Sequence, residues 1–81
     1  METAARFESA VAAARAEFGA TMRRHAAADL RIAITDLTGR IERLAEAERR
    51  GEPVDGMIRA NQAVVERKQA ALEELEEESN V

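Results

Sequence analysis

The 81-residue sequence contains no cysteine and a single histidine. Without cysteine the chain has neither a disulfide framework nor thiol chemistry, and one histidine alone cannot build a histidine-based metal site. No apolar run approaches the roughly 20 residues of a membrane span, and the first residues lack the basic-then-apolar pattern of a signal peptide. We therefore expect a cytoplasmic protein that binds no metal, no cofactor and no membrane.

Residue patterns typical of enzymes are also missing. The four glycines are isolated from one another, so they do not indicate a phosphate-binding loop, and Ser9 has no histidine partner. No pair of carboxylates stands at a spacing that suggests general acid and base catalysis. The sequence thus predicts a protein that is not an enzyme and has no small-molecule substrate.

Charge is distributed unevenly along the chain, which has a net charge of −4. Residues 1–50 carry nine arginines and eight acids, whereas residues 51–81 carry three bases and eight acids. Nucleic-acid binding is disfavoured because phosphate contacts require a basic face. The preference for arginine over lysine, together with abundant alanine, suggests a GC-rich bacterial genome.

The clearest helical pattern covers residues 30–50. Its large apolar residues recur at steps of four, three, four and three, which places them on one stripe of an α-helix. Arg49 and Arg50 suit the carbonyl end of a helix. Gly51 can adopt the left-handed cap and Pro53 cannot continue the helix, so we expect a turn over residues 51–54.

A second apolar stripe precedes the first and continues it with a mean step of 3.7 residues, so one nearly straight helix over about residues 3–50 can hold both. Residues 19–29 are the weak point, since Gly19 costs about 1 kcal/mol relative to alanine. A break there would give a compact three-helix bundle, which is the alternative. The continuous helix is favoured because alanines are abundant and no turn residues occur there. The second stripe consists of Phe7, Val11, Ala14, Phe18 and Met22.

A second helix is predicted over about residues 55–79, with Met57 and Val64 widening its apolar face. If the chain folds back at residues 52–53, the numbers of facing residues add up to about 105. The fold class is therefore all-α, a long helical hairpin that assembles into a bundle or coiled-coil-like oligomer. The expected hairpin core is Leu30, Ile34, Leu37, Ile41, Leu44, Ile58, Val65, Leu72 and Leu75.

The same fold-back makes predictions for polar residues. Lys68 is expected to pair with Asp36 while its stem covers apolar surface, and Asn61 is expected to fix the register. The acidic run over residues 73–78 opposes the helix dipole at its end, so it either remains a solvated face or meets basic residues. The basic residues that the fold-back brings near it are Arg23, Arg24 and Arg31.

The two expected helices differ in length, at about 70 Å and 37 Å. We expect one domain, residues 1–81, with a protruding half over residues 3–29 and an antiparallel hairpin over residues 30–79. The protruding half leaves an apolar stripe in water, and soluble monomers rarely do so. A second copy, giving a homodimer, or another helical protein is expected to cover it. The interface residues are then Phe7, Val11, Phe18 and Met22.

Some segments resemble known families. Residues 30–50 resemble the first helix of the small all-helical chorismate mutases, which maps Arg31 onto a substrate-binding arginine. That family's helix continues to a catalytic lysine, whereas this one breaks at residues 51–53. Residues 17–31 resemble the phosphoacceptor helix of sensor histidine kinases, with His25 as the phosphorylated residue. Three alanines stand where that family places an acid and then Leu-Arg directly after the histidine.

The hairpin is also similar in shape to needle subunits and co-chaperones of type III secretion. The function that we predict is a protein–protein interaction or adaptor module that self-associates through its first apolar stripe. The alternative is a small helical chaperone, similar to a secretion co-chaperone, that holds a partner helix. A third possibility is an acidic decoy that binds a basic protein surface.

Overall fold

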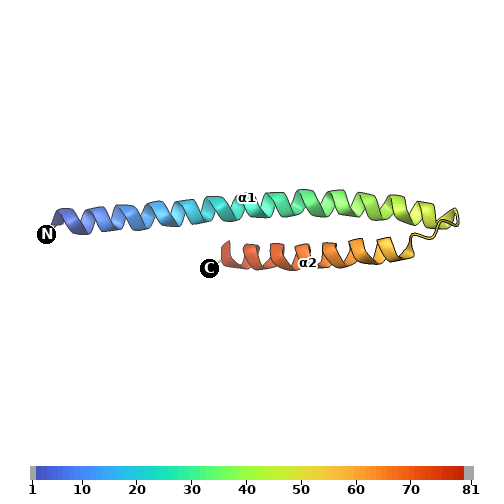
Figure 1. Cartoon of the computed structure of the whole chain (residues 1–81). Helices are drawn as coiled ribbons and strands as arrows, with labels where there is room; N and C mark the ends of the chain where they lie inside the picture. Colours follow the sequence, from blue (N-terminus) through green and yellow to red (C-terminus); the bar gives the residue numbers. More distant parts are fainter. Residues whose placement is uncertain (1, 80–81) are drawn as a thin grey trace.

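The computed structural model describes the backbone of residues 2–79 and the side chains of residues 5–78. This part of the chain forms two antiparallel α-helices, α1 (Glu2–Arg49) and α2 (Asp55–Ser79) (Figure 1). The molecule measures 74 × 16 × 15 Å. It is a rod, two helices thick near the turn and one helix thick at the N-terminal end (Figure 1). The predicted all-α helical hairpin is confirmed.

Helix α1 is continuous across residues 19–29, where the alternative three-helix bundle required a break. This stretch contains strong helix formers and no proline, so nothing in it stops the hydrogen-bond ladder. Gly19 is tolerated within the helix, and the guanidinium of Arg23 lies over it: a Cβ at Gly19 would be 3.4 Å from Arg23 Nη1. The two apolar stripes therefore lie on one rod.

The end of α1 is fixed by a glycine with left-handed backbone geometry. Gly51 has a φ of 92°, a conformation that L side chains rarely adopt. Its N–H donates to the carbonyl of Glu48 at 2.9 Å, and the N–H of Glu52 donates to the carbonyl of Ala47 at 3.1 Å. This pair of bonds is the Schellman motif. It gives partners to two carbonyls at the helix end and reverses the chain.

Helix α2 begins directly after this turn. The carbonyl of Val54 accepts the N–H of Ile58 at 3.0 Å, so Val54 occupies the N-cap position and Asp55 is the first helical residue. The Asp55 carboxylate lies 3.2 Å from Arg59 and also complements the positive end of the helix dipole. Pro53 precedes the helix, where its missing N–H removes no helical bond.

The apolar residues by which α1 and α2 face each other are half-buried, because no third element within residues 2–79 covers the groove between the two helices. Ala27, at 8% exposure, is the one buried residue among the described side chains. It lies one turn before Arg31, which contacts the end of α2. The structure places all nine expected core residues in the half-buried class: Leu30, Ile34, Leu37, Ile41, Leu44, Ile58, Val65, Leu72 and Leu75.

Polar residues contribute less to the register than expected. Arg31 Nη2 donates to Glu76 Oε1 at 2.9 Å, and the two residue numbers are close to the predicted total of 105. In the described chain, Lys68 and Asp36 do not form the expected ion pair. An exposed pair gains little against the entropy of two long side chains. Asn61 Nδ2 donates to the carbonyl of Met57 at 2.7 Å, so this donor bonds within α2 instead of reaching α1.

Candidate interaction surface

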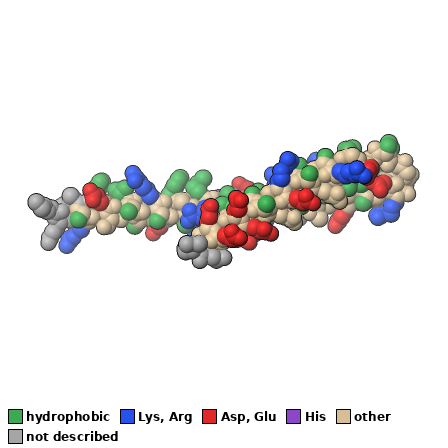
Figure 2. Space-filling view, turned by 90° about the horizontal axis from the view of Figure 1, so that it is seen from below, with side chains coloured by type: hydrophobic (Ala, Val, Ile, Leu, Met, Phe, Trp, Pro, Cys, Tyr) green, Lys and Arg blue, Asp and Glu red, His purple; other side chains and the backbone are tan. Residues whose placement is uncertain are grey.

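Four predicted interface residues lie on the first half of α1, and three of them are among the exposed large apolar residues. We call this set the N-terminal stripe: Phe7, Val11, Phe18 and Met22. Phe7 is 70% exposed, Phe18 is 68% exposed and Met22 is 53% exposed, while Val11 is half-buried. Their spacings of four, seven and four residues place them on one side of the helix. Helix α2 lies beside the other half of α1 (Figure 1). Hydrophobic side chains accordingly project from the protruding half of the rod (Figure 2).

The exposed area of this stripe sets the strength of any contact that it makes. Burying what remains exposed of its four side chains would contribute roughly 4 kcal/mol per chain. Two chains together would gain about 8 kcal/mol, from which the cost of association must be subtracted. The N-terminal stripe therefore suits a reversible, concentration-dependent contact.

A shallow depression of about 310 Å³ lies beside the stripe. It combines apolar walls with two opposite charges, those of Glu8 and Arg15, and neither of these residues forms an ion pair in the described chain. Apolar periodicity alone did not point to these two residues. Their spacing of seven, on one flank of the stripe, was the available signal. The depression is lined by Phe7, Glu8, Val11, Ala12 and Arg15.

The acidic run at the end of α2 is connected to α1 by one ion pair among the described residues. This pair joins Arg31 to Glu76, whose side chains are both more than half exposed. Arg24 donates within α1 instead, and Arg23 extends back over Gly19 with its Nε buried and unpaired. Of the three expected arginines, one therefore pairs with the run. Figure 2 shows acidic side chains grouped on the surface near this end.

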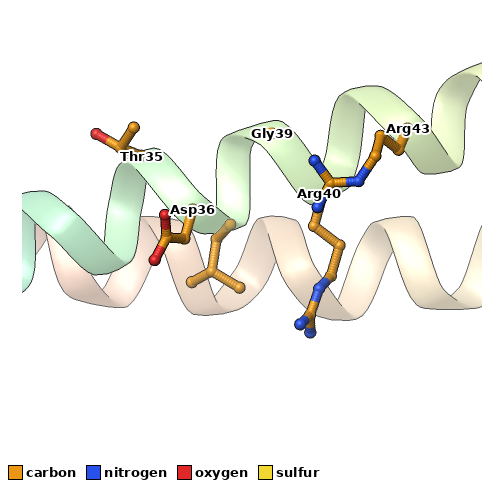
Figure 3. Close-up of a pocket in the computed structure, with 6 residues that line it drawn as sticks. Thr35, Asp36, Gly39, Arg40 and Arg43 are labelled. Atoms are coloured by element: carbon orange, nitrogen blue, oxygen red, sulfur yellow. The ribbon is translucent and has the colours of Figure 1, made fainter.

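A second depression, of about 380 Å³, lies on the hairpin half and is shown in Figure 3. Arg40 extends across the ribbon of α2, Arg43 lies beside Gly39, and Thr35 points away from α2 (Figure 3). Its lining holds neither histidine nor cysteine, so it lacks an activated nucleophile of the Ser–His or Cys–His type. The full lining is Thr35, Asp36, Leu37, Gly39, Arg40 and Arg43.

The two residues singled out by family resemblance, His25 and Arg31, are both exposed. His25 is exposed beside a depression of about 250 Å³ that is also lined by Thr21, Arg24 and Ala28. The guanidinium of Arg31 is bonded to Glu76. Within the described residues, no three His, Cys, Asp or Glu side chains are grouped to hold a metal ion. None of the described helices has the length and apolar character needed to cross a membrane.

Two further large apolar residues are exposed on the hairpin half. Ile32 is 62% exposed and Met57 is 55% exposed. Met57 was expected to widen the α2 face that packs on α1, and this was wrong, whereas Val64 is half-buried as expected. In the sequence, Ile32 lies between the hairpin core residues Leu30 and Ile34, and it projects to a different side of α1 from them.

Known protein families, characterised proteins and solved structures were all compared with this chain, and none of them matches it.

Proposed function

We propose that this chain is a non-enzymatic protein–protein interaction module that self-associates through the N-terminal stripe. The observation that carries the proposal is the 70% and 68% exposure of Phe7 and Phe18 on a helix face that α2 does not reach. Isolated apolar residues on a surface are ordinary, but a contiguous row on one helix face marks an interaction site.

A second copy is the partner that this surface favours. Because α1 is exposed along its first half, two copies can cover each other's stripes with the same residues, as symmetric homodimers do. The charges on this half are mixed, and Glu8 and Arg15 give each copy one acid and one base beside the stripe. Because each copy carries both an acid and a base beside the stripe, binding to this surface needs no partner of opposite net charge.

The substitution Phe18→Glu tests the proposal. Phe18 is largely exposed, and glutamate is a good helix former, so the hairpin itself should stay folded. In a two-fold dimer the change removes two phenylalanine contacts and places two charges in an apolar interface. We expect the dimer dissociation constant to rise by at least roughly 100-fold. Light scattering during size-exclusion chromatography, across a range of concentrations, measures the mass of each form.

Ile32→Glu is the matched control, because Ile32 is similarly exposed but lies outside the N-terminal stripe. It should leave the mass of the dimer unchanged. A dimer that survives Phe18→Glu but dissociates with Ile32→Glu would place the interface on the hairpin half. A wild-type chain that remains monomeric at high concentration would reject self-association.

A further inference from the structure

Two pairs of apolar residues on the first half of α1 are placed symmetrically about residues 12 and 13. Phe7 and Phe18 lie at equal distances from this midpoint, and so do Val11 and Ala14. When two identical helices pair antiparallel about a two-fold axis, the numbers of facing residues have a constant total. Both of these pairs have a total of 25. One register therefore satisfies both at once.

We propose that the second copy packs antiparallel on the N-terminal stripe in the register where facing residue numbers total 25. Phe7 then contacts the partner's Phe18, and Val11 contacts the partner's Ala14, each contact occurring twice by symmetry. This pairing rests on the self-association proposed above. It buries the two most exposed large apolar side chains of the described residues against each other, as aromatic pairs favour.

Charge complementarity supports this register independently. Glu8 and Arg15 lie on the same flank of the stripe, seven residues apart. A two-fold antiparallel pair brings like flanks together, so Glu8 of each copy approaches the partner's Arg15, as flanking residues do in coiled coils. Two ion pairs result. Both residues lack an ion-pair partner in the described chain, so forming these pairs breaks none.

Other registers lose one of these features. Totals of 29 or 32 place Arg15 next to the partner's Arg15, where like charges repel. A total of 18 leaves Phe18 without a facing residue on the stripe. In a parallel pair in register, Glu8 of one copy lies more than one helical turn along the axis from Arg15 of the other copy. The total of 25 alone combines aromatic contact with opposite charges.

The depression beside the stripe also fits this arrangement. In the proposed register the partner's Phe18 lies opposite Phe7 and next to Glu8 and Val11, three of the residues that line the depression. The partner's side chain therefore has a recess to enter, which is the knobs-into-holes relation of paired helices.

The lengths of the helices are compatible as well. Because Arg31 contacts Glu76, the last residue of α2 lies close to residue 28 of α1. The start of the partner's α1 would lie close to residue 23. The partner's helix thus begins about where α2 ends, without overlapping it. Each α1 would be accompanied along its whole length, half by α2 and half by the second copy.

Distances between spin labels test the register directly. The chain has no native cysteine, so Ala5→Cys and Ala20→Cys each give one labelled site. Both sites lie on the side of α1 opposite the stripe, and their numbers total 25. In the proposed dimer of either variant, the two labels, one on each chain, are separated by about 22 Å along the helix axis. The two variants should therefore give equal distances in double electron–electron resonance.

Each of the other possible results contradicts a specific part of the proposal. A longer distance for Ala5→Cys than for Ala20→Cys, or the reverse, would overturn the register while leaving the antiparallel dimer. Short and equal distances of the kind expected without axial separation would show a parallel pair and overturn the proposal. The absence of coupling, with a monomeric mass, would overturn self-association itself and with it this pairing.

A charge exchange tests the ion pairs. Glu8→Arg and Arg15→Glu should each raise the dimer dissociation constant roughly tenfold, since two attractions become two repulsions. The double variant should return to within about threefold of wild type. Neither residue has a charged neighbour three or four positions away, so the monomer should be little affected. Additive weakening in the double variant would refute the proposed contact between Glu8 and Arg15.

Discussion

The turn offers a sharp test of the fold, because two glycines near it should respond to alanine in opposite directions. Gly51 has a φ of 92°, whereas Gly56 lies inside α2 with ordinary helical geometry. Nothing lies within 4 Å of a Cβ built at either position. Steric collision therefore plays no part, and the backbone conformation alone determines the effect of each substitution.

The magnitudes follow from this comparison. For Gly51→Ala, the left-handed conformation costs about 1 to 2 kcal/mol, and the reduced entropy of the unfolded chain returns about 0.4 to 1 kcal/mol. The net loss should be about 1 kcal/mol. For Gly56→Ala, the better helix propensity of alanine should stabilise the fold by about 0.5 to 1 kcal/mol. Urea unfolding followed by circular dichroism, at one fixed chain concentration, measures both.

The sign of the difference decides the outcome. If Gly51→Ala stabilises the hairpin as Gly56→Ala does, the turn does not hold a left-handed residue and the Schellman motif is refuted. Gly51→Asn is the intermediate case, because asparagine tolerates this conformation better than alanine. It should lose less stability than Gly51→Ala.

Two further predictions concern what holds the helices together. Glu76→Gln should change the unfolding free energy by less than about 0.5 kcal/mol, because its ion pair is exposed. Leu72→Ala in the half-buried groove should lower it by about 1 to 2 kcal/mol. Urea unfolding compares the two variants, and a larger loss for Glu76→Gln than for Leu72→Ala would contradict this ranking. In hydrogen exchange, amides of residues 5–26 should exchange faster than those of residues 30–45 in dilute solution, and slow down as concentration rises. Exchange that is uniform along α1 at every concentration would show that α2 does not protect its half.

The sequence was sufficient to predict the fold because its local signals agree with one another. The steps between apolar residues gave the helical stripes, and Gly51 with Pro53 gave the turn. The uncertain point was the stretch near Gly19, where propensity weakens but no residue stops a helix. Helix α1 is continuous there because a helix ends only where a residue interrupts its backbone hydrogen bonds, as Gly51 does.

Polar contacts were harder to predict from sequence. The predicted fold-back places Lys68 opposite Asp36, yet they form no ion pair among the described residues, and Asn61 bonds to its own helix. Long or flexible polar side chains choose among partners of nearly equal free energy, and water is one of them. Glu8 and Arg15 were missed for a related reason, since no apolar pattern marks them and their proposed partners lie in another chain.

The two halves of α1 differ in how far their apolar and charged residues are covered or paired within one chain. Over the hairpin half, the apolar stripe is half-buried by α2 and Arg31 has an acidic partner. Over the protruding half, Phe7 and Phe18 are mostly exposed, and Glu8 and Arg15 beside them form no ion pair with any described residue. Both deficits lie on the same face, and both end where α2 begins to cover α1. Most of the stability of a helix in a protein comes from packing of its apolar face, so the same contact that buries the phenylalanines should also stabilise the helix that carries them.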